Sequence, residues 1–309
     1  KLINKKAAVI IINWNGRKFL KNCLSSVFNQ TYKNFNVYLV DNGSIDGSSA
    51  YAKNSFPKVK IVQLNKNYGF AKGNNKGIKE AFKDKRVEYI ICLNNDTIVD
   101  KNWLKELIKT AQKDNKIGAV GSKLLYFYSK NKINTMGIIP LKNGNALNLH
   151  KNEFSKNYIK EEKIFGPCAG SALYKRNILK KVGLFDEAYF CYLEDVDLAY
   201  RINRKGFYCL VNPHSKVLHI HSATSSKNSN FKWFLINKNS LLNSYKYFGW
   251  STFLLYPFIT LGYYRDFIKK KDIKKEIQEI SKMKMFGLII KAYFFAFKDI
   301  LKGNLIYGK

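Results

Sequence analysis

The sequence predicts an α/β protein, with a doubly wound, mostly parallel sheet of the Rossmann-like kind and a C-terminal helical extension. Short apolar segments rich in β-branched residues alternate with segments of helical periodicity, and each apolar segment ends at a cluster of polar residues. After residue 225 the pattern changes to aromatic residues interleaved with Lys. A length of 309 residues is sufficient for one large domain followed by such an extension.

The expected elements follow in order along the chain. Strands are predicted over residues 7–12, 35–40, 59–64 and 89–93, with a helix from Phe19 to Phe28 and another through Ile78 and Ala81. Between the third strand and that second helix, residues 65–77 are expected to form an Asn- and Gly-rich loop. Later we expect a helix after Trp103, strands at 117–120 and 207–211, a helix beginning near Glu194, and a flexible insertion or hairpin over 129–163.

The composition favours an anionic partner. Lys and Arg total 54 against 22 Asp and Glu, which gives a formal charge of +32. A general Lys bias that covers every solvated face is the alternative, and the absence of a dense basic block argues against sequence-specific reading of nucleic acid. The five scattered Cys residues indicate reduced thiols of an intracellular protein, and no secretory signal is visible at the start of the sequence.

Polar residues at three strand ends predict a single cleft. Asp41, the loop over 65–77 and Asp96 would lie along one edge of the sheet, where open α/β sheets bind their ligands. Asp96 is therefore a candidate for handling a metal or a phosphate, although a plain Asx turn would also explain it. Neither the first strand end nor Gly69, Gly73 and Gly77 fit G-x-G-x-x-G, which disfavours a dinucleotide dehydrogenase.

Four motifs in succession resemble family 2 glycosyltransferases, which are inverting enzymes of the GT-A fold, and the rhamnosyltransferase-like branch most closely. The motifs are Val9–Asn15, Val40–Ser48, Asn67–Asn75 and Leu93–Thr97. Each is weak alone, but four in this order and spacing are specific. The resemblance implies a catalytic domain over residues 1–225, with a nucleotide-binding half at about 1–121 and an acceptor half at about 122–225.

The resemblance also assigns candidate donor and metal residues. A nucleoside diphosphate sugar, with UDP or dTDP as the nucleotide, would bind with Asp41 at its base and with Asn13, Asn15, Asn42, Gly69, Lys72, Gly73, Asn74, Asn94 and Asn95 around it. In this family a D-x-D motif commonly binds the divalent cation, but here only the last carboxylate, Asp96, is present. His219 is the expected second ligand, with His221 a weaker candidate, and Mn²⁺ or Mg²⁺ is the natural ion.

The second half of the chain carries the expected catalytic pair. Glu194 and Asp195 resemble the family's Glu-Asp motif, so Asp195 would be the general base that deprotonates the acceptor hydroxyl, with Glu194 orienting the acceptor. The alternative is that the two acids have no catalytic role and only cap the N-terminus of a helix, where the helix dipole favours negative charge. Gly170 and Arg201 are expected near the sugar or the acceptor, and Arg201 is also expected to pair with Asp197 at i,i+4.

The extension over residues 226–309 is predicted to be helical. Its aromatic and Lys residues favour a helix that lies on an anionic membrane. A glycan or polyprenyl-linked glycan acceptor would be found there. The alternative is that the extension packs on the catalytic domain. The expected location is cytoplasmic and peripheral on the inner face of the cell membrane. Competing functions are a nucleotidyltransferase acting on sugar phosphates and a non-enzymatic basic module that binds membrane or nucleic acid.

Overall fold

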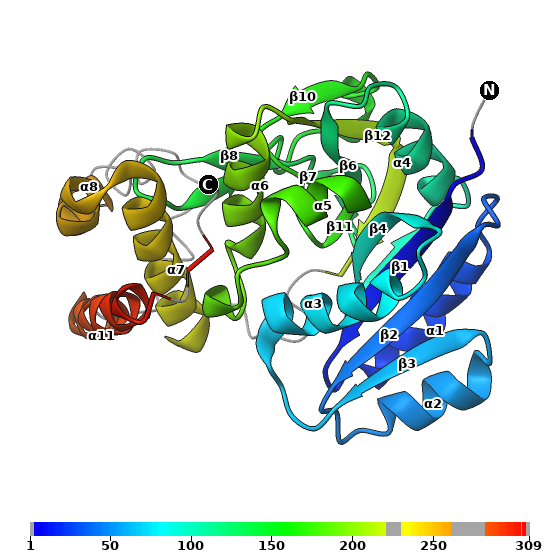
Figure 1. Cartoon of the computed structure of the whole chain (residues 1–309), viewed down its shortest axis with the longest axis horizontal. Coiled ribbons are helices and arrows are strands. Elements are labelled where there is room, and N and C mark those ends of the chain that lie inside the picture. Colours follow the sequence, from blue (N-terminus) through cyan, green and yellow to red (C-terminus); the bar gives the residue numbers. More distant parts are fainter. Residues whose placement is uncertain (1–2, 221–229, 261–281, 304, 307–309) are drawn as a thin grey trace.

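The computed structural model describes residues 3–220, 230–260, 282–303 and 305–306. One large sheet organises the chain, with its strands in the order β10-β12-β6-β11-β4-β1-β2-β3 (Figure 1). The strands at its centre and one side are β1 (Lys6–Asn13), β2 (Phe35–Asn42), β3 (Val59–Leu64) and β4 (Val87–Asn94). The others are β6 (Ile117–Tyr126), β10 (Glu162–Ile164), β11 (Ser171–Lys175) and β12 (Tyr208–His219).

The strand directions place several strand ends at one edge. Strands β1 to β4 are mutually parallel, β11 is antiparallel to both β4 and β6, and β12 is parallel to β6. Strand β12 therefore runs in the same direction as β4. The ends of β1, β2, β4 and β12 consequently meet at the carboxyl edge, where a sheet of this kind binds ligands.

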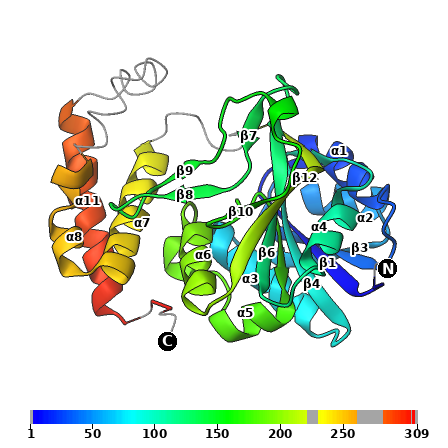
Figure 2. The ribbon, with the colours of Figure 1, turned by 90° about the horizontal axis from the view of Figure 1, so that it is seen from above.

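Helices cover both faces of the sheet, which gives three layers (Figures 1 and 2). One core lies between the sheet and α1 (Arg17–Phe28), α2 (Ser48–Ser55) and α4 (Trp103–Ala111). The other lies against α3 (Gly69–Phe82), α5 (Arg176–Val182) and α6 (Glu194–Arg204). Because both faces are covered, the central strand β1 is apolar from Ala7 to Ile12 without alternation, whereas the edge strand β3 carries exposed Lys60 and Gln63.

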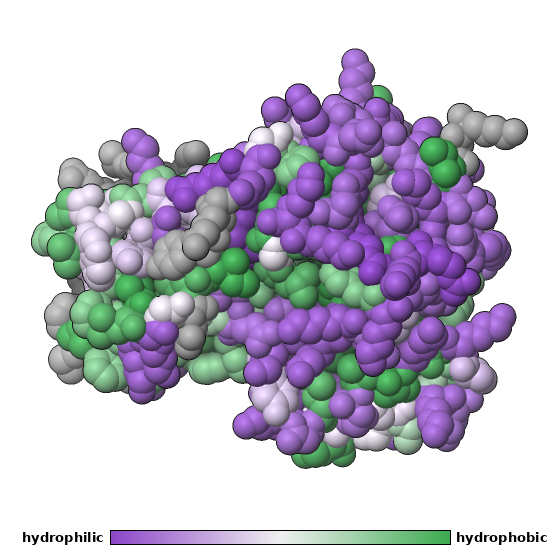
Figure 3. Space-filling view, viewed as in Figure 1, coloured by the Kyte–Doolittle hydropathy of each residue, from purple (hydrophilic) through white to green (hydrophobic). Residues whose placement is uncertain are grey.

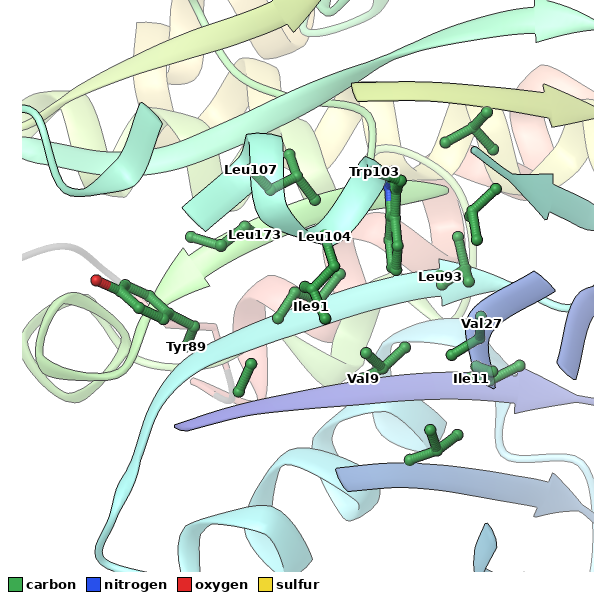
Figure 4. Close-up of a cluster of buried hydrophobic side chains, with 14 of the residues drawn as sticks. Val9, Ile11, Val27, Tyr89, Ile91, Leu93, Trp103, Leu104, Leu107 and Leu173 are labelled. Atoms are coloured by element: carbon green, nitrogen blue, oxygen red, sulfur yellow. The ribbon is translucent and has the colours of Figure 1, made fainter. Parts of the chain in front are cut away.

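Trp103 is the largest fully buried side chain of the first core, and it lies above Leu93 and Leu104 in Figure 4. Its indole Nε1 donates to Ser122 Oγ and Ser171 Oγ, at 3.0 and 2.9 Å. Those two serines stand on β6 and β11. The bonded indole thus ties α4 to β6 and to β11, the strand next to β4.

Most expected elements of the catalytic domain are confirmed, but residues 69–77 are not a loop. They form the first turns of α3. Gly73 and Gly77 face the sheet, where an added Cβ would meet Ile12 Cδ1 at 2.3 Å and Ile10 Cγ2 at 2.5 Å. These glycines therefore allow the helix to approach β1 closely, which a sequence rich in Gly and Asn does not reveal.

The insertion over 129–163 is built of short strands. They are β7 (Ile133–Thr135), β8 (Ile138–Pro140) and β9 (Ala146–Asn148), of which β8 and β9 form a hairpin and β7 pairs with β6. A 3₁₀ turn, η1 (Ser155–Asn157), leads from them to β10. The hairpin alternative of the prediction is confirmed.

The described part of the C-terminal extension is mainly helical and includes α7 (Asn230–Phe248), α8 (Trp250–Leu254) and α11 (Lys282–Leu301). They share a small core that includes Leu241, Phe253 and Ala296, and Figure 2 shows them at one end of the molecule. Within the described residues, no helix is long and apolar enough to cross a membrane.

Helix α7 packs on the catalytic domain through buried polar residues as well as apolar and aromatic ones. Asn239, Ser240, Asn243 and Ser244 are fully buried. The tip of the β8–β9 hairpin docks there: Asn243 Nδ2 donates to Gly144 O at 2.9 Å, and Ser244 Oγ donates to Asn143 O at 2.7 Å. The packing alternative for the extension therefore holds for α7.

Candidate active site

The turns after β1 and β2 form one hydrogen-bonded unit. Asn13 Nδ2 donates to Ser44 Oγ at 3.2 Å, and the Ser44 amide donates to Asp41 Oδ1 at 2.9 Å. The other carboxylate oxygen of Asp41 accepts from Ser49 Oγ at 2.6 Å. Asn15, with φ of 49°, accepts the Ile45 amide on its Oδ1 at 2.9 Å. The parallel register of β1 and β2 brings together these residues, which the sequence predicts to bind the nucleotide-sugar donor.

The second turn also holds the start of α3. Asn42 Nδ2 donates to Asn67 Oδ1 and Gly69 O, at 2.9 and 3.1 Å, and Asn42 Oδ1 accepts the Tyr68 amide at 3.0 Å. Lys72 lies further along α3, with Nζ 3.5 Å from Glu187 Oε2. The sequence predicts a loop beside the nucleotide here, whereas the structure has the hydrogen-bonded N-terminus of α3.

Gly73 and Asn74 were predicted to contact the nucleotide-sugar donor, but their observed contacts are with the protein itself. Gly73 faces Ile12 of the sheet, and Asn74 is fully buried with its Nδ2 donating to Phe70 O of its own helix. Both positions serve the packing of α3, because the segment is helical where a loop was predicted.

Asp96 sits in the tight turn between β4 and β5 (Thr97–Val99). Strand β5 pairs antiparallel with β12, so that Thr97 stands opposite His219. This register brings His219 Nε2 to 3.3 Å from Asp96 Oδ1, and Asn94 Nδ2 lies 3.4 Å from the same nitrogen. Asn95 turns the other way, donating from Nδ2 to Asn13 Oδ1 at 2.7 Å.

The His219 ring is oriented by a residue that the sequence did not reveal. Its Nδ1 lies 3.0 Å from Asn134 Oδ1, on β7 of the insertion. Since an amide oxygen can only accept, Nδ1 donates to Asn134, whereas Nε2 lies beside both the Asp96 carboxylate and the Asn94 amide nitrogen. A metal-binding imidazole is usually held in this way, by an acceptor bonded to the ring nitrogen that does not face the metal.

A divalent cation fits this pair only with further ligands from outside the chain. Among the residues that the structure describes, no group of three His, Cys, Asp or Glu side chains is placed to hold a metal. Asp96 and His219 offer one carboxylate and one imidazole, whereas Mg²⁺ and similar ions take about six ligands. A diphosphate and water would have to supply the remainder. His221 lies outside the described residues.

Glu194 and Asp195 begin α6, as predicted. Asp195 Oδ2 accepts the Ala169 amide at 3.1 Å, and burial raises the pKa of Asp195 although this bond and the Val196 amide oppose the rise. Burial and the neighbouring Asp195 raise the pKa of Glu194 well above its usual range. Glu194 Oε2 finds no hydrogen-bond partner within the described part of the chain.

The acidic pair and the strand-four turn are linked through residues 168–170. The Asn94 amide donates to Gly170 O at 3.0 Å, and a Cβ added to Gly170 would lie 3.3 Å from Asn94 Nδ2. One residue earlier, Ala169 binds Asp195. Residues 168–170 therefore connect the turn that carries Asp96 with the start of α6 that carries Asp195.

The loop before Glu194 has an unusual backbone. Phe190, Tyr192 and Leu193 have φ of 58°, 72° and 64°. Bulky residues rarely adopt such values, which cost about 1–3 kcal/mol each and cluster at functional sites. Phe190 O accepts the Ala71 amide at 3.1 Å and would meet a Cβ on Gly69 at 2.4 Å, so Gly69 is required for contact with this loop.

Arg201 does not serve the acceptor. It is fully buried, and its guanidinium donates to Asp197 Oδ2 at 3.0 and 2.8 Å and to the carbonyls of residues 182–184. Its predicted pairing with Asp197 is confirmed, and Lys246 of α7 binds the same carboxylate. All donors of Arg201 point into this network, so the expected position near an acceptor is wrong.

The mostly parallel sheet, the polar strand ends and the buried acidic pair define a transferase of the GT-A type. A family described as glycosyl transferase family 2 matches residues 8–183. The chain therefore belongs to glycosyl transferase family 2 and is a glycosyltransferase, as the motifs predict.

Relatives agree with this assignment. The chain is 26% identical over 240 residues to the N-acetylglucosaminyl-diphospho-decaprenol L-rhamnosyltransferase of Mycobacterium tuberculosis, covering 71% of this chain and 76% of the relative. The fold resembles GalNAc-T7 with UDP, GalNAc and Mn²⁺, at a TM-score of 0.63 and 18% identity, over 78% of this chain and 48% of that one. It also resembles a mannosyltransferase of Pyrobaculum calidifontis with GDP-Man and Mn²⁺, at a TM-score of 0.55 and 13% identity, over 96% and 87%.

Proposed function

We propose that this enzyme transfers a sugar, with inversion, from a nucleoside diphosphate sugar to a hydroxyl of a glycan or lipid-linked glycan. The observation that carries the proposal is the short link from the Asp96–His219 pair through Asn94 and Gly170 to Asp195. This link supports an arrangement in which the base and the diphosphate lie on opposite sides of the reacting carbon. An in-line displacement needs that arrangement.

Each group then has one role. Asp195 takes the proton of the acceptor hydroxyl as the oxygen forms its bond to the anomeric carbon. The bond from that carbon to the diphosphate breaks, and its electron pair leaves with the nucleoside diphosphate. A raised pKa makes Asp195 a stronger base than an exposed carboxylate. Glu194, buried beside it, is placed to orient the acceptor.

Asp96 and His219 are the residues that would hold a divalent cation, Mn²⁺ or Mg²⁺. When bound, the ion offsets negative charge on the departing diphosphate. The hydrogen bond from His219 Nδ1 to Asn134 Oδ1, which orients the ring with Nε2 toward Asp96, supports His219 as a ligand. The Mn²⁺ in both structural neighbours supports the same ion here. The nucleotide is proposed to lie along Asn13, Asn15, Asp41, Asn42 and Asn95.

The reaction is tested by the product that leaves the donor. UDP-, dTDP- and GDP-sugars are incubated with Mn²⁺ and with N-acetylglucosaminyl-diphospho-polyprenol, the acceptor class in the name of the mycobacterial relative. We expect release of a nucleoside diphosphate that depends on both substrates. Release of pyrophosphate would instead identify a nucleotidyltransferase, and salt-sensitive binding to oligonucleotides or anionic vesicles without turnover would identify a binding module.

We also propose that α8 and α11 rest on an anionic membrane at the inner face of the cell membrane. Ile290, Phe294 and Leu301 lie on one face of α11 and are 55, 65 and 69% exposed, with Phe258 beyond α8 at 71%. Apolar residues gather at this end of the molecule in Figure 3. Exposed Lys291, Lys298 and Lys302 beside them suit acidic headgroups. The Lys run over 269–275 lies outside the described residues.

Vesicle flotation tests this surface. The double variant Phe258→Asn, Phe294→Asn is expected to lose binding to phosphatidylglycerol vesicles while keeping turnover of a water-soluble acceptor. Ile159→Asn is the control, because Ile159 is 61% exposed but lies on the insertion. Equal binding by all three proteins would remove the membrane from the proposal.

A further inference from the structure

The loop over residues 190–193 that leads to the catalytic pair is neither helix nor strand, and at its start Cys191 N donates to Tyr189 O. Residues 190–193 contain three of the six non-glycine residues with positive φ among those described, and Leu193 immediately precedes Glu194. Such a conformation persists only where surrounding groups hold it. The position of Asp195 therefore depends on what fixes this loop.

Asn239 of α7 is the side chain that gathers the loop carbonyls. Its Nδ2 lies 2.8 Å from Tyr189 O, 2.9 Å from Cys191 O and 2.7 Å from Tyr192 O, and the residue is fully buried. An amide nitrogen has two hydrogens, so three carbonyls converge on two donors. Converging carbonyls repel one another unless such a donor lies between them.

Helix α7 is itself held rigidly against the domain. Lys246 binds Asp186 at 3.0 Å and also Asp197, and Tyr189 donates from its hydroxyl to Asn243 Oδ1 at 2.6 Å. Asn239 is thus presented from a fixed element, and its hydrogen bonds reach the loop within two residues of Glu194. A rigid supporting element is what a precise catalytic geometry requires.

We infer that Asn239 is a positioning residue for the transfer reaction, acting through the loop over 189–193 on Asp195. The inference rests on the proposed function, because it needs Asp195 to be the base. It also gives the C-terminal extension a catalytic purpose: α7 completes the active site that the sheet domain begins. The competing explanation is that Asn239 only fastens α7 to the domain.

Asn237 provides the matched control. It is an asparagine on the same helix, 6% exposed, and its Oδ1 accepts from Tyr256 Oη at 2.7 Å inside the extension. Its amide therefore stabilises the helical unit without a described contact to the loop. A purely structural role for Asn239 predicts that the two asparagines behave alike.

The experiment compares Asn239→Asp, Asn239→Ala, Asn237→Ala and Asp195→Asn. Asp replaces the donor with an oxygen of the same shape, and Ala serves if Asp does not fold. We expect both Asn239 variants to lower kcat by about tenfold to a hundredfold, since a shift of about 1 Å suffices. KM for the donor and the Kd of UDP or dTDP with Mn²⁺ should stay within about twofold. Asn237→Ala should lose thermal stability and keep kcat.

The failures are distinguishable. If Asp195→Asn turns over normally, the assignment of the base is wrong and the proposed function fails. If Asp195→Asn is inactive while the Asn239 variants match Asn237→Ala in kcat at equal stability, only the positioning role is overturned. The same conclusion follows if the Asn239 variants weaken nucleotide binding as much as they slow turnover.

Discussion

Replacing Lys246 by Met should destabilise the protein far more than a surface lysine would. Lys246 is nearly fully buried and binds the equally buried carboxylates of Asp186 and Asp197. Met keeps most of the side-chain volume, so the change removes the charge without opening a large cavity. Breaking a buried pair by removing one partner costs about 3–5 kcal/mol, because the other charge stays buried.

The contacts that Asp186 and Asp197 keep in the variant decide where the cost falls between about 3 and 5 kcal/mol. Asp197 keeps Arg201 at 2.8 Å and the hydroxyl of Tyr247 at 2.6 Å. Asp186 keeps the amides of Ala188 at 3.1 Å and Ile306 at 2.9 Å. We therefore expect the free energy of unfolding to fall by about 3 kcal/mol, the lower end of that range.

Urea denaturation at pH 7 measures this value, with Lys238→Met as the control. Lys238 lies two turns earlier on α7 and pairs with Asp299 at 2.9 Å, whose side chain is 27% exposed. Lys238 is itself buried and also donates to Ala188 O at 2.6 Å, but it leaves behind one partly exposed carboxylate rather than two buried ones, so its loss should be smaller than that of Lys246. Equal losses in the two variants would refute the claim that a buried charge network docks α7.

The pH dependence has a definite sign. Burial alone would raise the pKa of Asp197, but Arg201 and Lys246 outweigh it and hold the pKa below the usual value. The stabilisation is complete above the unfolded pKa of about 4 and is lost as the pH falls through the lower folded value. The difference between wild type and Lys246→Met should therefore shrink below about pH 4.

Three further outcomes are expected. His219→Ala should abolish the Mn²⁺-dependent thermal shift with UDP or dTDP, and an unchanged shift would show that the coordination is wrong. Turnover should fall at acid pH as Asp195 becomes protonated, and the midpoint should lie above the usual pKa of an aspartate because burial raises the pKa of Asp195. A pH profile of kcat/KM measures this midpoint, and a profile that stays flat at acid pH would contradict the assignment. Gly77→Ala should lower stability by about 1–3 kcal/mol, because its Cβ would meet Ile10 at 2.5 Å and Val40 at 2.7 Å. Gly287→Ala, where nothing lies within 4 Å, should raise stability slightly, and thermal melts that rank the two variants the other way would contradict the packing argument.

The strands and the helix start that carries Glu194 and Asp195 could be predicted because their signals are local. A run such as Val9 to Ile12 has few other uses than a buried strand, and acids at the start of a helix follow the helix dipole. The helical state of residues 69–77 was missed because glycine is counted against helices. Here the close approach of α3 to β1 outweighs that propensity.

The residues that complete the site depend on tertiary contacts. Asn134 meets His219 across 85 positions of sequence, and Asn239 meets Tyr192 across 47. Both lie among many other asparagines, so nothing in the local pattern distinguishes them. Arg201 was misplaced for the same reason: pairing with Asp197 could be predicted from i,i+4 spacing, but its burial against α7 could not.

The most direct test of the account is the turnover of Asp195→Asn. The variant should fold, bind UDP or dTDP with Mn²⁺ as the wild type does, and release nucleoside diphosphate about 10² to 10⁴ times more slowly, the usual contribution of a general base. A folded Asp195→Asn variant that transfers sugar at a rate close to the wild type would contradict the central claim.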